Sequence, residues 1–320
     1  MHFEACSKAA GFHVGCLVSL PFKPSCGKSG LPSDISSAGM NSSYKRAASL
    51  KQGYQATPTI CAVIVLWLGG CATLPDVRTI GTTDGETSYA TAGDGRPVVV
   101  LESGMGPTMA TWSPIFDDLA QFATVFAYDR PGYGRSSSSQ PPRSASDIAK
   151  KLHALLAQAH HEPPYVLVGH SAGGLYINAF ARLFPNDIAG LVFVDATHPD
   201  WSDYLRQDHP FIYSTLITST TIGHFGMRRY EAEVISSTRK DFDNLPDFPN
   251  VPVVILTSEK SSLLSTRAMQ AKWSAFQRDL ASLSLNATHT VVAGSGHYIH
   301  QDRPEVVIEA VKSIVDGARQ

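Results

Sequence analysis

Gly169-His170-Ser171-Ala172-Gly173 is the segment of this sequence whose residue types and spacing could do chemistry. A serine with glycines two residues away on either side fits a sharp turn, because side chains at the glycine positions would collide with the neighbouring strand or helix. Such a turn lifts the hydroxyl clear of a sheet, where it can act as a nucleophile. The apolar run 165–168 precedes the motif and a helix-like segment, 174–180, follows it. The pattern therefore predicts a strand, a turn that carries Ser171, and a helix.

A serine hydroxyl has only the nucleophilicity of an alcohol, so it needs a base within hydrogen-bond reach and a third group that orients the base. His297 is the candidate base, because it follows the last predicted strand in a Gly-rich loop. This position predicts a side chain at the same edge of the sheet as Ser171. The alternative for His297 is a structural histidine with no chemical role.

Asp195 is a candidate for the orienting acid. It ends the apolar run 191–194, and open α/β sheets gather their functional groups at the carboxyl ends of such strands. The alternative for Asp195 is an aspartate that only caps a loop.

Short β-rich runs alternate with helical stretches from Thr79 onward, which predicts a mostly parallel sheet covered by helices on both faces. The runs are almost continuously apolar, as expected for strands buried on both sides. The predicted strands are 97–102, 124–128, 165–168, 190–194, 251–256 and 289–293. The predicted amphipathic helices are 145–160, 175–184, 269–285 and 304–318.

Two further segments complete a resemblance to a known family. Residues 128–136 read Tyr-Asp-Arg-Pro-Gly-Tyr-Gly-Arg-Ser, and residues 292–298 read Val-Ala-Gly-Ser-Gly-His-Tyr, followed by Asp-Arg-Pro-Glu at 302–305. Together with the serine motif, and in this order, they resemble the α/β-hydrolase family from about residue 81 to 315. The resemblance implies an α/β fold with a mostly parallel central sheet, helices on both faces and an inserted lid.

The same resemblance implies roles for further residues. It places the two backbone N–H groups of an oxyanion hole at Ala172 and Met105. The usual family position of the acid follows the penultimate strand, where this chain offers Glu259, whereas some relatives carry the acid after the preceding strand, at Asp195. Glu259 could instead be a solvated carboxylate beside Lys260. His170 is expected to pack beside the turn without acting on the substrate.

Asp129 and Arg130, in the loop after the predicted strand 124–128, are expected to form an ion pair that fixes this loop.

The segment 198–250 is too long for a simple connection between strands, and the resemblance implies that it is a lid over the active site. Its aromatic residues indicate an apolar acyl or alcohol pocket, or else they only pack the lid onto the core. They are Trp201, Tyr204, Phe211, Tyr213, Phe225 and Tyr230.

The leading hypothesis is therefore a serine hydrolase that cleaves small carboxylic esters through an acyl-enzyme. A serine in place of aspartate as nucleophile argues against dehalogenase or epoxide-hydrolase chemistry, while thioesters, lactones and amides stay open. The alternative is a catalytically inactive member of the fold that binds partners, since fold does not fix function. Its support is the absence of an aspartate after the strand 251–256.

The composition excludes other classes of function. The formal charge of −2 and the isoelectric point of about 6.6 give no reason to expect nucleic acid as a partner, and no basic stripe with interleaved aromatic residues occurs. No motif calls for a cofactor. The oligomeric state is left open.

The N-terminal 75 residues differ from the rest, because they hold all five cysteines. A basic segment, 45–51, leads into the apolar run 60–68 and then to Gly69-Gly70-Cys71. The run is short for a permanent membrane span but suits a secretory signal. Residues 68–71 resemble the lipobox of bacterial lipoproteins, which implies cleavage before Cys71 and lipid on its sulfur. The alternative is that 60–68 is a buried strand of the domain.

This interpretation divides the chain at Cys71. Met40 is a more natural start than Met1, since it brings the basic segment near the N-terminus; residues 1–39 would then be an over-extended start or an unusually long leader. Residues 40–70 are the expected signal peptide, and residues 71–320 form one domain with no other cysteine, hence no disulfide and no zinc site. Ala72 after the cysteine implies sorting to the outer membrane, facing the periplasm.

Overall fold

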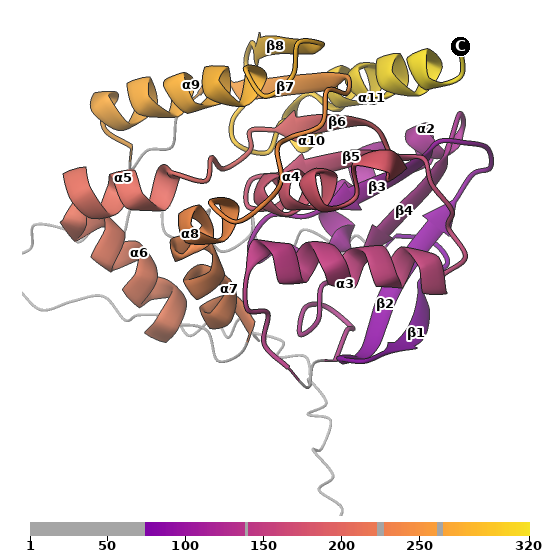
Figure 1. The fold of residues 1–320 in the computed structure, drawn as a ribbon, viewed down its shortest axis with the longest axis horizontal. Coiled ribbons are helices and arrows are strands. Elements are labelled where there is room, and N and C mark those ends of the chain that lie inside the picture. Colours follow the sequence, from indigo (N-terminus) through magenta and orange to yellow (C-terminus); the bar gives the residue numbers. More distant parts are fainter. Residues whose placement is uncertain (1–73, 138–139, 223–226, 261–264) are drawn as a thin grey trace, which may run out of the picture. The chain divides into compact units, whose positions relative to one another are not determined.

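A mixed sheet of eight strands forms the centre of the part of the chain that the structure describes (Figure 1). The structure is a computed structural model, and it describes residues 74–137, 140–222, 227–260 and 265–320. In space the strands follow the order β1-β2-β4-β3-β5-β6-β7-β8. The pairings β1 with β2 and β2 with β4 are antiparallel, and the other five are parallel. The strands are β1 (Arg78–Thr82), β2 (Gly85–Ala92), β3 (Val98–Glu102), β4 (Thr124–Tyr128), β5 (Tyr165–His170), β6 (Ile188–Val194), β7 (Val253–Ser258) and β8 (Ala287–Val292).

Helices connect the parallel strands, and local sequence signals mark several of their ends. Ser144 and Thr266 precede two helices, and their hydroxyls accept the N–H groups of Asp147 and Met269 at 3.1 and 3.2 Å. Pro304 opens the last helix, where its missing N–H costs nothing. The helices outside the β6–β7 connection are α2 (Ser113–Ala120), α3 (Ala145–Gln158), α4 (Gly173–Leu183), α9 (Arg267–Ala281), α10 (Ile299–Asp302) and α11 (Pro304–Ala318).

Strand side chains alternate between two apolar cores, one on each face of the sheet. Val98 and Val100 of β3 belong to the core that contains residues of α3 and α4. Val99 and Leu101 belong to the core that contains residues of α2 and α11. Because the side-chain period of a strand is two, a run that is apolar throughout fills both cores. The prediction of strands buried on both faces is confirmed for β3, β4, β5, β6 and β7. It is wrong for β8, which lies at the edge of the sheet and is mostly exposed.

The predicted strands and helices are all present, with boundaries shifted by a few residues. The prediction began the helix after Ser171 at Leu175, but α4 begins at Gly173, because glycine carries no apolar signal. The antiparallel pair β1–β2 and the short helix α2 were not predicted. Residues 1–73, with Cys71 and the expected signal peptide, lie outside the described residues. Within the described residues, no helix has the length and apolarity needed to cross a membrane.

The connection between β6 and β7 contains the insertion that the length of 198–250 predicted, and its described residues form four helices. Its helices lie together at the left of Figure 1. Asp241 accepts the N–H and hydroxyl of Ser146 at 2.9 and 2.8 Å, and Arg182 donates to the carbonyl of Pro246 at 2.8 Å. These bonds fasten the insertion to α3 and α4. Its helices are α5 (Trp201–Asp208), α6 (Pro210–Ile222), α7 (Met227–Ser236) and α8 (Thr238–Phe242).

Candidate active site

Ser171 lies on a strained turn between β5 and α4. Its φ angle is +53°, a left-handed conformation that non-glycine residues rarely adopt. A Cβ on Gly169 would lie 2.8 Å from the carbonyl oxygen of Gly173, and a Cβ on Gly173 would lie 2.3 Å from the carbonyl oxygen of Glu102. Both distances are too short for real atoms, so the spacing of the two glycines around the serine has a steric cause.

Backbone hydrogen bonds join this turn to the residues around Asp195. The N–H of Ser171 donates to the carbonyl of Val194 at 3.2 Å, and the N–H of Thr197 donates to the carbonyl of Ser171 at 2.9 Å. Asp195 itself has a φ angle of +44°, and its N–H donates to the carbonyl of Leu256 on β7 at 2.7 Å. The serine turn and the aspartate turn are thus held side by side at the ends of neighbouring parallel strands.

The carboxylate of Asp195 is buried and accepts four hydrogen bonds, two on each oxygen. Oδ1 accepts the N–H of Ser258 and the indole N–H of Trp273, both at 3.0 Å. Oδ2 accepts the hydroxyl of Ser258 at 3.0 Å and contacts Nδ1 of His297 at 2.7 Å. A buried carboxylate is costly unless such donors satisfy it. Sequence reasoning missed Ser258 and Trp273, because no local pattern marks a residue whose partner lies far away in the sequence.

The contact between His297 and Asp195 decides the tautomer of the imidazole. A carboxylate only accepts hydrogen bonds, so Nδ1 of His297 carries the proton and Nε2 keeps its lone pair. The side chain of His297 is 42% exposed, whereas that of Asp195 is 3% exposed. The imidazole is therefore anchored at its buried nitrogen and can take up a proton at the other.

Glu259, the other candidate acid, is exposed and has a different partner. Its Oε2 accepts the N–H of Gly294 at 2.7 Å, in the loop that leads to His297. The structure thus brings Asp195 to the imidazole, while Glu259 supports the loop backbone from outside. Glu259 is neither the expected partner of His297 nor merely a solvated carboxylate.

The loop after β3 packs directly against the serine turn. A Cβ on Gly104 would lie 3.1 Å from Cβ of Ser171 and 3.0 Å from Nδ1 of His170, so this position accepts only a small residue. Met105, the expected second donor of an oxyanion hole, follows Gly104 and packs against the core that holds α3 and α4. Ala172, the other expected donor, is buried directly after Ser171.

His170 packs beside the turn, as the resemblance implied, and contacts the backbone of the histidine loop. Its Nε2 contacts the carbonyl oxygen of His297 at 3.0 Å, so Nε2 carries the proton. Burial, with a smaller contribution from His297, lowers the pKa of His170 well below its ordinary value. Burial likewise lowers the pKa of His300, which lies against Trp112, to about 3. Both imidazoles stay neutral and add no charge near His297.

The expected ion pair between Asp129 and Arg130 is not formed, which corrects the sequence analysis. Asp129 accepts the backbone N–H groups of Met109 and Arg135 at 2.8 and 3.2 Å. Arg130 instead pairs with Glu102 at 2.6 Å and with Glu231 at 2.7 Å. Adjacent residues in a turn point in different directions, so neighbouring opposite charges in the sequence did not predict a contact.

The aromatic residues of the insertion have different environments. Trp201 packs edge-to-face on Trp273, at 4.9 Å between ring centres, and so lies behind the donor to Asp195. The side chain of Phe211 is 81% exposed among the described residues, and Phe225 lies outside them. Among the described residues of the insertion, these rings do not all line one apolar pocket. No cluster of three or more potential metal ligands occurs among the described residues.

Comparison with known proteins agrees with this architecture. YqjL, an uncharacterised protein of Bacillus subtilis, is 28% identical over 222 residues, which is 69% of this chain and 85% of YqjL. RutD of Caulobacter vibrioides, which carries the provisional name of a carbamate hydrolase, is 40% identical over 131 residues, 38% of this chain and 46% of RutD, so less than half of that protein is matched. A thermophilic esterase from Thermogutta terrifontis superposes with a TM-score of 0.52 at 21% identity, over 76% of this chain and 99% of the esterase, a likeness of fold alone. The model of the alpha/beta hydrolase family matches residues 98–310, and the chain belongs to this family.

Proposed function

We propose that this protein is a serine hydrolase that cleaves carboxylic esters through an acyl-enzyme, with Ser171 as nucleophile, His297 as base and Asp195 as acid. The observation that supports it most is the 2.7 Å contact between His297 and Asp195, on an aspartate turn that is bonded to the turn of Ser171. A buried carboxylate is costly unless donors satisfy it, and here one of its four donors is an imidazole, the arrangement that acyl transfer by a serine requires.

The first half of the reaction transfers the acyl group to Ser171. The Oγ–H proton moves to Nε2 of His297 while Oγ forms a bond to the carbonyl carbon, whose oxygen becomes an oxyanion. Asp195 stabilises the imidazolium. As the carbon–oxygen bond to the alcohol breaks, the Nε2 proton passes to the departing oxygen, so the alcohol leaves neutral.

The second half returns the enzyme to its starting state. Water gives a proton to Nε2 of His297 and its oxygen bonds to the acyl carbon, and a second oxyanion forms. The bond to Oγ of Ser171 then breaks and Oγ takes back the proton, so the carboxylic acid is released. In both halves the amides of Met105 and Ala172 would donate to the oxyanion.

We choose carboxylic esters because their cleavage needs only the nucleophile, base and acid proposed above. An alkoxide leaves with one proton from His297, whereas an amine is a poorer leaving group. A serine nucleophile also argues against epoxide or haloalkane opening, for which a carboxylate nucleophile is needed. The provisional name of RutD describes cleavage of a carbamate, which is also an acyl transfer.

The test is hydrolysis of p-nitrophenyl acetate and octanoate by the full chain, with Ser171→Ala as the decisive variant. We expect turnover by the native protein, a loss in Ser171→Ala, and covalent labelling of Ser171 by a fluorophosphonate. Turnover that survives in Ser171→Ala would refute the proposal. If the native protein shows no turnover and Ser171 is not labelled, the result favours the alternative, a binding protein built on an inactive hydrolase fold.

A further inference from the structure

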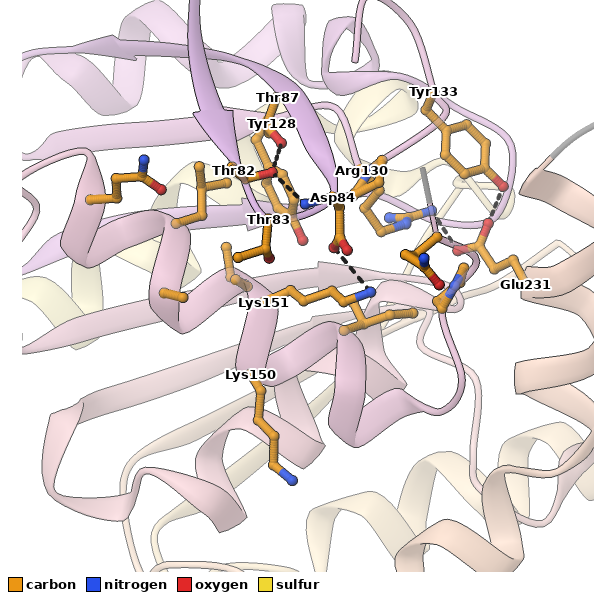
Figure 2. Close-up of a pocket in the computed structure, with 18 residues that line it drawn as sticks. Thr82, Thr83, Asp84, Thr87, Tyr128, Arg130, Tyr133, Lys150, Lys151 and Glu231 are labelled. Carbon is orange, nitrogen blue, oxygen red and sulfur yellow. Dashed lines mark hydrogen bonds and ion pairs between the residues drawn. The ribbon is translucent and has the colours of Figure 1, made fainter. Parts of the chain in front are cut away.

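A buried cluster of charges lies behind the loop that follows β3. Arg130, Glu102 and Glu231 are 6%, 0% and 1% exposed, and the two carboxylates pair with the guanidinium at 2.6 and 2.7 Å. We call these three residues, with Tyr133 and Tyr176, the Arg130 cluster. Figure 2 shows Arg130, Tyr133 and Glu231 together at one side of a cavity of about 230 Å³ that is lined mainly by α3 and the β1–β2 turn. Ser171 does not line this cavity.

Arg130 also holds the backbone of the loop that packs on Ser171. Its Nη1 donates to the carbonyl of Ser103 and its Nη2 to the carbonyl of Gly104, each at 2.6 Å. Hydrogen bonds from a cation are short and strong, and two from one rigid guanidinium fix both position and direction. Arg130 thus fixes the backbone of the loop at two successive carbonyls.

The second of these bonds constrains the proposed oxyanion donor. The carbonyl of Gly104 and the N–H of Met105 belong to one planar peptide group, in which they point in opposite directions. Fixing the carbonyl on Arg130 therefore fixes the direction of the N–H. A cation on the carbonyl oxygen also polarises the peptide and makes its N–H a better donor.

Glu231 connects this arrangement to the helical insertion. It lies on α7, ion-pairs with Arg130, and accepts the hydroxyls of Tyr133 and Tyr176, the latter at 2.8 Å. Tyr176 is on α4, the helix that begins just after Ser171. Burial raises the pKa of Glu102, and Arg130 opposes this. Burial lowers the pKa of Arg130, but Glu231 and then Glu102 oppose it, and the pKa lies well above its ordinary value.

We propose that Arg130 is a positioning residue that orients the Met105 amide for the oxyanion, and that Glu231 couples the docked insertion to this amide through Arg130. The inference rests on the proposed function and deepens it. The insertion then does more than cover substrate. With α7 docked, the Arg130 cluster is complete and the donor is aligned; without Glu231, the guanidinium loses its partner on α7.

The test compares Arg130→Lys and Glu231→Gln with the native full chain. Lysine keeps the charge but cannot hold two carbonyls in one plane, and glutamine keeps the size but not the charge. Lys151→Gln is the matched control, because Lys151 lines the same cavity and pairs with Asp84 at 3.0 Å, away from the loop. We expect kcat for p-nitrophenyl butyrate to fall about 10- to 100-fold in Arg130→Lys, up to what loss of one oxyanion donor costs, and about 3- to 10-fold in Glu231→Gln. The KM of both variants, and both kcat and KM of the control Lys151→Gln, should stay close to the native values.

A second measurement separates orientation from general structural damage. A trifluoromethyl ketone forms a tetrahedral adduct whose oxyanion needs the same donor. Its inhibition constant should rise in proportion to the loss of kcat/KM across the variants, with melting temperatures near the native value. An unchanged inhibition constant despite lower kcat, or full activity in a folded Arg130→Lys, would overturn the inference. If Arg130→Lys does not fold, Glu231→Gln decides by the same criterion.

Failure of the inference and failure of the proposed function give different results. The rate of fluorophosphonate labelling of Ser171 also depends on the oxyanion donors and needs no ester substrate. Labelling that slows in Arg130→Lys, in a protein that hydrolyses no ester, would keep the inference and reject the ester class. Ester hydrolysis that is lost in Ser171→Ala but unchanged in Arg130→Lys and Glu231→Gln would keep the proposed function and reject the inference.

Discussion

Replacing Asp195 by asparagine should abolish most of the activity while leaving the fold intact. Asparagine has nearly the same shape, but it offers one oxygen and one NH₂ group in place of two accepting oxygens. The backbone N–H of Ser258 and the indole of Trp273 both donate to Oδ1, so the amide oxygen should take that position. The NH₂ group then faces His297, whose Nδ1 must accept. The proton moves to Nε2, and the imidazole can no longer take the proton of Ser171.

The magnitude follows from this change of tautomer. Loss of the correct tautomer in a serine triad costs about 10³–10⁴-fold in kcat, or about 4–5.5 kcal/mol of transition-state stabilisation. Glu259→Gln should stay within about 3-fold, since glutamine can still accept the N–H of Gly294 and the side chain is exposed. The assay is kcat and KM for p-nitrophenyl butyrate, with thermal unfolding as the control for folding. A larger loss in Glu259→Gln than in Asp195→Asn would move the acid to Glu259 and refute the reasoning.

Three further predictions concern the turn, the buried histidines and the N-terminus. Gly173→Ala should unfold or inactivate the protein, because its Cβ would lie 2.3 Å from a carbonyl oxygen, whereas Gly317→Ala, with nothing within 4 Å, should be neutral or stabilising; equal melting temperatures would contradict this. The folded pKa of His300 is lowered to about 3, so its native imidazole stays neutral while the unfolded one gains a proton below about pH 6.5, and stability is lost as the pH falls. The free energy of unfolding, measured with urea, should fall by about 2 kcal/mol more between pH 7 and pH 5 in the native protein than in His300→Gln. The same fall with pH in both proteins would refute the prediction. We propose that Cys71 carries lipid and anchors the protein to the bacterial outer membrane, facing the periplasm; globomycin or Cys71→Ala should then leave a heavier, unlipidated precursor, and a correctly cut soluble protein after Cys71→Ala would refute the anchor.

How far the sequence predicted this fold depends on whether the signal was local. The strands of the parallel core were predictable because each is an apolar run filling two cores, and the serine turn because steric conflicts at Gly169 and Gly173 leave a visible spacing. β1 and β2 escaped prediction because their residues are mostly polar or small and only partly buried, so neither strand is an apolar run. The presence of an insertion followed from the length of the segment 198–250, but its helices and the contacts of Glu231 did not.

Contacts between distant segments explain what the sequence could not decide about the site. The choice between Asp195 and Glu259 depends on the register of β6 against β7, which pairs Val194 with Leu256. That register places the residues after both strands at one edge of the sheet, so an acid from either strand could approach the histidine loop. Here the earlier strand provides the carboxylate and Ser258 of the later strand donates to it twice. In the triad that we propose, the acid therefore follows β6, and Ser258 at the end of β7 contributes only hydrogen bonds to it.

The site and its support obey different rules, and this difference explains which residues the sequence revealed. The chemistry that we propose for Ser171 and His297 is one that few residue types can do, so residue type and spacing were enough to select them as candidates. Arg130 and Trp273 act through backbone carbonyls or a buried carboxylate, tasks that many residues could perform from many positions. Only the fold selects among those positions. A residue that acts on the substrate can thus be recognised from the sequence, whereas a residue that orients another is recognised only from the three-dimensional structure.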